Sequence, residues 1–258
     1  MKFSFKCKVI INIETKENKY LLPILNFNKR AHSSEQLDNL SLSGEVLLQT
    51  LSSLKFINKI FGNHKHLANS ILEYCQANPE KKTFHIIDLG CGGGDSIHYI
   101  SKKLNQNNIK TSFLGIDGNP QSIAYATSKY KDHNTIKFKT DNILDEQFSI
   151  PKCDIVISSH FVYHFKSNDL PIFLKKAQQK GISHVILSEL RRSKVAYILF
   201  KYSSYIMPIS SLAKKDGLIA IQRAFTRSEL DFILNESNTK KYSINKKPWF
   251  RTLTKIDL

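Results

Sequence analysis

Hydrophobic residues recur along this chain in two patterns, one with the spacing of a helix and one typical of short buried strands. Helical spacing dominates residues 34–75, for example at Leu47, Leu51 and Leu54, and the pair Asn78 and Pro79 ends the last of these helices. Short apolar runs then occupy 83–89, 111–117, 136–139, 154–159 and 183–189. Helical stretches separate most of these runs, which predicts a parallel sheet built of βαβ units.

The alternation changes after the fifth predicted strand. Residues 191–207 have the pattern of one amphipathic helix, and Thr226 and Glu229 have the spacing of a capping box that opens another. Two final apolar runs, 241–245 and 252–256, flank a turn that contains Pro248. These runs predict a closing hairpin.

The chain of 258 residues suits one α/β domain with helical additions. We divide it into an N-terminal extension (1–30), a helical cap (31–80) and a core (81–258) that carries a helical insertion at 191–222. The extension could begin with a strand near its N-terminus. The predicted fold class is α/β, a Rossmann-like doubly wound sheet.

The first predicted strand runs into the glycine-rich segment Asp88-Leu89-Gly90-Cys91-Gly92-Gly93-Gly94-Asp95. Ligands of such sheets bind beyond the carboxyl ends of the strands, where glycines let a ligand approach the backbone closely. A dinucleotide fingerprint would require Gly or Ala in place of Asp95, and a P-loop would require Gly-Lys-Ser/Thr. Asp88 places a carboxylate beside the ligand, which disfavours a pyrophosphate and favours the ammonium and sulfonium of S-adenosylmethionine.

Asp117 closes the second predicted strand. An acid at this position can accept hydrogen bonds from ribose hydroxyls, as in other nucleoside-binding sheets. It could instead cap the following helix. Together with the glycine-rich segment, it favours a nucleoside ligand.

These motifs resemble those of class I S-adenosylmethionine-dependent methyltransferases. Asp88-x-Gly90-x-Gly92-x-Gly94 resembles their motif I, and Asp117 their second-strand acid. Residues 139–143 resemble the motif whose acid faces the adenine, and 153–159 resemble motif IV. The resemblance implies a seven-stranded sheet with a C-terminal antiparallel strand, S-adenosylmethionine as cofactor and an SN2 methyl transfer. The expected cofactor-binding residues are Asp88, Gly90, Cys91, Gly92, Gly94, Asp117, Gly118, Asp141, Asn142 and Ser159.

The segment that leaves the fourth strand carries two histidines, His160 and His164. It lacks the Asn/Asp-Pro-Pro-aromatic sequence of enzymes that methylate base amino groups, and Cys153 lies at the wrong end of the strand for a cytosine-C5 nucleophile. The histidines resemble the exit segment of ubiquinone- and menaquinone-type methyltransferases. Either one could take the proton from a phenol or enol, since histidine titrates near neutral pH. Either could also be structural, with catalysis resting on the positioning of the acceptor.

Two further segments, 188–193 and 223–230, resemble a bacterial subgroup associated with type III polyketide and phenolic-lipid pathways. This resemblance implies O-methylation of a phenolic, quinol-like or polyketide-derived small molecule. The apolar residues of 195–212 could line the pocket of this acceptor, or could simply pack an amphipathic helix on the sheet.

The amino-acid composition indicates the cellular setting in which the protein folds. The hydrophobic fraction of 41% supports a buried core. The four cysteines form no CxxC pair, which argues against a disulfide framework and against a metal site. With no secretory signal or membrane-spanning stretch in its pattern, we expect a cytoplasmic protein.

The net charge is +16 at pH 7. Such a charge fits an RNA methyltransferase or contact with an anionic membrane surface, but it also fits compositional drift that favours lysine. Only six of the 38 basic residues are arginines, which disfavours specific recognition of nucleic-acid bases. A further alternative is a protein that binds the cofactor without turnover. The intact glycines and acids of the predicted site disfavour it.

Overall fold

The computed structural model describes residues 26–258 except 238 and 240. The prediction of an N-terminal strand falls on residues outside this range. The helices are α1 (Gly44–Ile60), α2 (Asn63–Gln76), α3 (Asp95–Asn105), α4 (Pro120–Lys129), α5 (Asp169–Gln179), α6 (Lys194–Ser203), α7 (Ser211–Arg223) and α8 (Arg227–Glu236), with short 3₁₀ helices η1 (Gln36–Asp38) and η2 (Val162–His164). The strands are β1 (Phe84–Leu89), β2 (Thr111–Asp117), β3 (Ile136–Thr140), β4 (Ile155–Ser159), β5 (His184–Leu190), β6 (Lys241–Lys247) and β7 (Arg251–Asp257).

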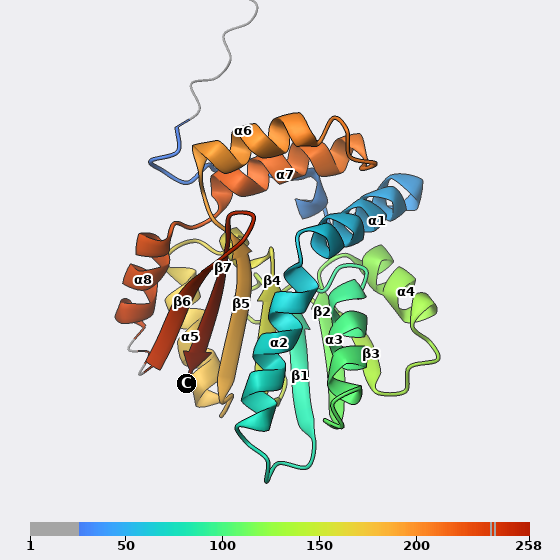
Figure 1. The fold of residues 1–258 in the computed structure, drawn as a ribbon, viewed down its shortest axis with the longest axis vertical. Coiled ribbons are helices and arrows are strands. Elements are labelled where there is room, and N and C mark those ends of the chain that lie inside the picture. The colour runs from blue at the N-terminus through green and yellow to red at the C-terminus, as the bar shows by residue number, and fades with distance from the viewer. Residues whose placement is uncertain (1–25, 238, 240) are drawn as a thin grey trace, which may run out of the picture.

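The described strands form one seven-stranded sheet in the order β3-β2-β1-β4-β5-β7-β6 (Figure 1). Strands β1 to β5 pair in parallel, while β7 runs antiparallel to both of its neighbours. The order reverses between β1 and β4, which is the switch point where such sheets bind ligands. The predicted fold class and the closing hairpin are confirmed.

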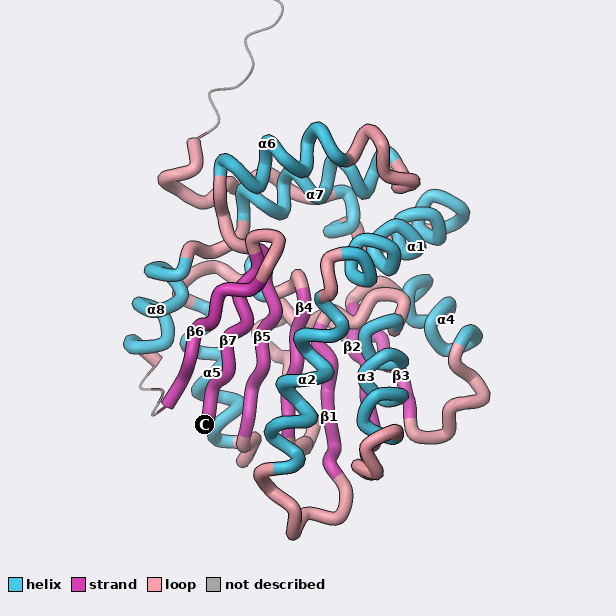
Figure 2. The backbone as a smooth tube through the Cα atoms, viewed as in Figure 1, coloured by secondary structure: helices cyan, strands magenta, loops and turns pink. Residues whose placement is uncertain are grey.

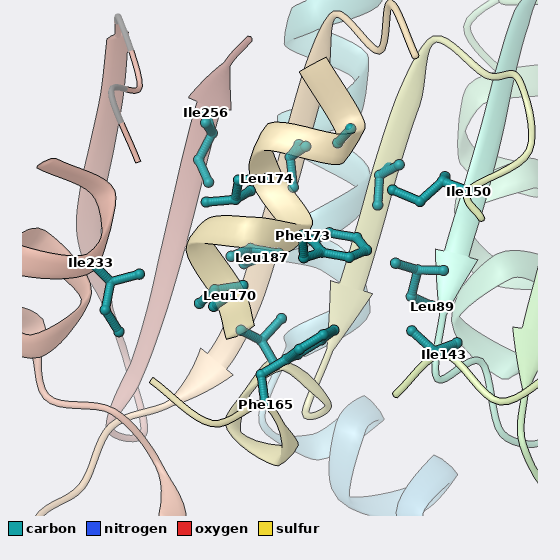
Figure 3. Close-up of a cluster of buried hydrophobic side chains, with 14 of the residues drawn as sticks. Leu89, Ile143, Ile150, Phe165, Leu170, Phe173, Leu174, Leu187, Ile233 and Ile256 are labelled. Carbon is teal, nitrogen blue, oxygen red and sulfur yellow. The ribbon is translucent and has the colours of Figure 1, made fainter. Parts of the chain in front are cut away.

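Helices cover both faces of the sheet (Figure 2). Alternate side chains of β1 enter two different cores, because successive residues of a strand point to opposite faces. Ile87 and Leu89 pack with α5 and α8, in the cluster drawn in Figure 3. Phe84 and Ile86 pack with α2, α3 and α4. This two-sided burial explains why the strands are continuous apolar runs.

The third group of helices, α1, α6 and α7, lies across the carboxyl end of the sheet (Figure 1). We call these three helices the cover. Helix α6 approaches α7 so closely that a Cβ at Gly217 would lie 2.6 Å from the ring of Phe200. Two segments far apart in sequence therefore build the roof over the switch point.

The structure differs from the predicted organisation in two places. The helix predicted at 191–207 is present but shorter, as α6 (Lys194–Ser203), and after Pro208 the side chain of Ser210 accepts the N–H of Ala213 to begin a separate helix, α7. Proline cannot donate to a preceding turn, so it separates the helices. Helix α2, expected in the cap, packs on the sheet instead, with buried Leu67 and Ile71. Among the described residues, no helix is both long and apolar enough to span a bilayer.

Candidate functional site

A cavity of about 830 Å³ lies between the carboxyl ends of the central strands and the cover. Its floor is formed by the glycine-rich segment after β1, by the ends of β2 and β4, and by the loop after β3. Its roof consists of α1, α6 and α7, and the β6–β7 hairpin closes one side. The topological switch point thus opens into one large and mostly apolar chamber.

The glycine-rich segment turns sharply at the floor of the cavity. Gly90 has φ +73°, and a Cβ there would lie 2.6 Å from the ring of Phe161. The backbone N–H groups of Gly90 and Cys91 both donate to the carbonyl of Ile116, at 2.9 and 3.1 Å. Only glycine meets both demands at position 90, a positive φ and a close neighbour. The segment therefore presents bare backbone to a ligand.

Asp117 is joined to this segment. Its Oδ2 accepts the N–H of Gly92 at 2.9 Å, and its Oδ1 accepts the N–H of Asn119 at 2.9 Å. The side chain that caps α4 is Asn119, which accepts the N–H groups of Gln121 and Ser122. The alternative role of Asp117 as a helix cap is thus taken by Asn119, and the remaining lone pairs of the carboxylate can accept ribose hydroxyls.

Asp88 is buried at the end of β1 and lines the cavity. Burial raises its pKa well above the usual range, and the nearby carboxylates of Asp95 and Asp117 raise it further. Three acids held this close repel one another when all are ionised, and a bound cation relieves that repulsion. The ammonium and sulfonium of S-adenosylmethionine supply such positive charge, so the floor fits this cofactor.

The structure brings most of the predicted cofactor-binding residues to the cavity. Those that line it are Asp88, Gly90, Cys91, Gly92, Asp117, Gly118, Asn142 and Ser159. Ser159 is also held by the amide of Asn63, at the start of α2, which in turn accepts the hydroxyl of Ser188. Asn63 was missed in the sequence because nothing in the local pattern of α2 links it to β4.

Two predicted cofactor-binding residues, Gly94 and Asp141, do not line the cavity. Gly94 begins α3 with φ +74°, and a Cβ there would meet Phe138 rather than a ligand. The carboxylate of Asp141 is partly exposed and pairs with Lys139 at 2.7 Å. Its successor Asn142 lines the cavity in its place.

His160 follows β4 in a left-handed conformation, with φ +55°. Its Nε2 accepts a hydrogen bond from the guanidinium of Arg251, and burial, with Arg251 and His64 nearby, lowers its pKa well below the usual range. The imidazole is therefore neutral and carries its proton on Nδ1. Because the lone pair of Nε2 accepts the hydrogen bond from Arg251, His160 cannot take a proton from a substrate through this nitrogen.

His164 also lines the cavity, and its ring contacts both an acid and an arginine. Its Nδ1 lies 3.1 Å from Asp38 Oδ1 and also 3.1 Å from Arg223 Nη2, and Nη1 of the same guanidinium lies 2.7 Å from Asp38 Oδ2. Although burial opposes it, the contacts with His164 and Arg223 lower the pKa of Asp38 to about 2. Asp38 is therefore ionised and can accept the Nδ1 proton of His164, whereas Arg223 can donate only to an unprotonated Nδ1. In the tautomer that Asp38 selects, Nε2 is the acceptor nitrogen.

Asp38 owes its position to contacts with the cover. The carboxylate of Asp216, on α7, accepts the backbone N–H groups of Gln36 and Leu37 at 2.9 and 3.0 Å. This anchors η1 beside His164. Neither Asp38 nor Asp216 was predicted, because the signal is a contact between segments distant in sequence. Arg223 lay in a segment of recognised resemblance but had no assigned role.

Glu35, Asp38 and His164 each offer a possible metal ligand within 4.8 Å of one another. Arg223 already contacts both carboxylates, at 3.2 and 2.7 Å. Burial raises the pKa of Glu35 to about 8 despite Arg223, so this carboxyl is largely protonated at neutral pH. A cluster balanced by an arginine and a protonated acid has little negative charge left for a cation.

Residues 80–255 match the sequence model of a family described as a methyltransferase domain. The chain belongs to this family. The predicted membership in a methyltransferase family and the predicted class I fold are confirmed.

Solved structures show the same fold in other methyltransferases. The CurJ carbon methyltransferase has 16% identity and a TM-score of 0.56, over 75% of this chain and 53% of its own. A putative O-methyltransferase from Nostoc punctiforme PCC 73102 has 12% identity and a TM-score of 0.55, over 85% and 63%. The magnesium protoporphyrin IX methyltransferase of Synechocystis PCC 6803, with bound SAH, has 16% identity and a TM-score of 0.51, over 78% and 87%. The chain thus spans about half the length of CurJ and under two thirds of the Nostoc protein. No curated protein matches it in sequence.

Proposed function

We propose that this methyltransferase methylates an oxygen of a phenolic, quinol-like or polyketide-derived small molecule. The observation that carries the proposal is the pair formed by His164 and Asp38 at the cavity wall. Methylation of a phenol requires removal of one proton, and an oriented imidazole is a suitable base. Of the two histidines predicted for this role, we assign it to His164 and not to His160.

The cofactor supplies the electrophilic methyl group, and the residues of this chain handle the acceptor. In this proposal Asp38, rather than Arg223, sets the tautomer of His164, and it stabilises the imidazolium that forms when Nε2 takes the acceptor proton. Arg223 holds Asp38 from the other side and keeps it ionised. His160 and Arg251 support the wall beside the pair.

The cavity also favours an apolar acceptor. Its roof presents Leu51, Leu54 and Ile57 from α1, together with Leu199 and Phe200 from α6. An aromatic or aliphatic acceptor buries its surface against such side chains, and the few polar groups below them can fix its orientation. The fold alone does not select this acceptor, because its solved relatives include carbon, oxygen and porphyrin methyltransferases.

The proposal is tested by incubating the protein with methyl-labelled cofactor and a cell extract, and then separating lipids and small molecules from RNA. We expect label in the organic phase, stable to acid as a methyl ether is. Label confined to RNA would instead favour the second candidate function, RNA methylation, for which the observation is the net charge of +16. Label on carbon would retain the acceptor class but contradict transfer to oxygen.

A further inference from the structure

The outer face of the cover is unusually apolar. Helix α6 exposes Val195, Ile198, Leu199 and Tyr202, and the turn after it exposes Tyr205 and Ile206. Their spacing places the α6 members on one helical face. Tyr202 is 67% exposed and Ile206 88%. In an ordinary surface helix such a stripe faces the core, whereas here Ala196 is buried on the inner side.

This apolar face continues into the mouth of the cavity. Leu199 both lines the cavity and is exposed, and the same is true of Ile60 at the end of α1 and Trp249 at the tip of the β6–β7 hairpin. Phe61 packs against Trp249, with ring centroids 5.3 Å apart. The end of α1, helix α6 and the β6–β7 hairpin thus each bring an exposed apolar residue to the cavity.

The segments that supply Ile60, Leu199 and Trp249 carry charges of one sign. No acidic residue occurs between Glu45 and Glu73, between Glu189 and Asp216, or between Glu236 and Asp257, the three segments that contain these residues. The exposed lysines of these segments include Lys55, Lys59, Lys194, Lys215 and Lys246. Basic residues that border an apolar face are typical of surfaces that lie on anionic lipid.

We propose that the outer face of α6, with Ile60 and Trp249 at the cavity mouth, docks on an anionic lipid bilayer. The apolar side chains enter the boundary between headgroups and acyl chains, where tyrosine and tryptophan are favoured. The lysines contact the headgroup phosphates. Docked in this way, the mouth opens toward the acyl region, so a lipid-soluble acceptor can enter the cavity without crossing water. This last step rests on the proposed function, but the docking itself does not.

The test is sedimentation of the full chain with vesicles of phosphatidylcholine alone or mixed with phosphatidylglycerol. We expect binding to the anionic vesicles, weakened by salt. The double variant Tyr202→Ser/Ile206→Ser should lower the partition coefficient about ten-fold or more. Its matched control is Ile172→Ser/Phe232→Ser, because these two residues are also exposed but lie on α5 and α8. The control should bind as the unaltered chain does.

Two charge-reversal double variants distinguish the effect of lysines near the cavity mouth from the effect of the net charge of the protein. Lys194→Glu/Lys201→Glu should weaken binding to anionic vesicles several-fold more than Lys131→Glu/Lys137→Glu, which makes the same change in net charge away from the mouth. Equal effects of the two pairs would overturn the proposal, as would absence of vesicle binding.

Two other outcomes would also overturn it. If Tyr202→Ser/Ile206→Ser altered the oligomeric state in sedimentation velocity but not vesicle binding, the face would be a contact between copies. If the lysine variants weakened binding of an RNA probe but not of vesicles, the partner would be nucleic acid. Calorimetry with S-adenosylmethionine distinguishes all of these from a failure of the methyltransferase site, because neither Tyr202 nor Ile206 lines the cavity.

Discussion

Asp117 accepts the backbone N–H of Gly92 through Oδ2, at 2.9 Å. This bond joins the end of β2 to the glycine-rich segment that follows β1. The acid expected to bind the ribose is therefore already oriented by the segment expected to surround the rest of the cofactor. Such preorganisation lowers the entropic cost of binding.

Asp117→Ala should weaken S-adenosylmethionine binding by ten-fold or more, about 1.4 kcal/mol, because a charged hydrogen-bond acceptor is lost. Asp141→Ala is the matched comparison, since the carboxylate of Asp141 pairs with Lys139 outside the cavity. Titration calorimetry measures both. Equal losses for the two variants would place Asp141 at the cofactor as well.

Gly90→Ala should destabilise the fold more than Gly181→Ala. Both glycines have φ +73°, so the backbone strain of alanine is similar at the two positions. A Cβ at Gly181 meets nothing within 4 Å, whereas one at Gly90 meets Phe161 at 2.6 Å. Overpacking of this kind costs about 1–3 kcal/mol. Denaturant unfolding compares the two variants, and equal losses would show that Phe161 moves aside freely.

Cofactor binding should release a proton and strengthen as pH rises. In the free protein the raised pKa of Asp88 keeps this carboxyl protonated at pH values where an exposed aspartate is ionised. The positive cofactor favours the carboxylate and displaces the proton. Calorimetry in buffers of different ionisation enthalpy measures the release. Asp88→Asn should abolish it, and an unchanged release would assign the proton to another group.

The same shift has a consequence for stability. Because the pKa of Asp88 is higher in the folded chain than in the unfolded chain, its contribution is present at low pH and is lost as pH rises through the folded value. Without cofactor, Asp88→Asn should therefore flatten the decline of the melting temperature toward alkaline pH. Thermal unfolding across a pH series tests this, and identical profiles for the two proteins would contradict it.

His164→Ala should lower kcat by about 10²- to 10⁴-fold, the range of a lost general base, with a smaller effect on KM. Asp38→Asn should act in the same direction, because an amide no longer holds the Nδ1 proton as a carboxylate does. His133→Ala, an exposed histidine after α4, is the control and should leave kcat unchanged. Steady-state kinetics with the identified acceptor measures all three. Full activity of His164→Ala would leave catalysis to positioning of the acceptor.

Much of the fold follows from local pattern. The run 111–117 coincides with β2, and the spacing of Thr226 and Glu229 predicted the capping box that begins α8. These features depend on side chains a few residues apart, so the sequence reveals them directly. The predicted helix ended at 207, just before Pro208, whereas α7 was expected only as part of the helical insertion at 191–222.

The sequence by itself determined the cofactor half of the site. A glycine-rich segment after a buried strand, with Asp88 before it and Asp117 at the next strand end, has one geometry in a parallel sheet, since these strand ends meet at one edge. Only the tertiary structure brings together the residues of the proposed acceptor half. It pairs His164 with Asp38 and His160 with Arg251, partners far apart in sequence. Which histidine retains a free nitrogen depends on those long-range contacts, and no local pattern encodes them.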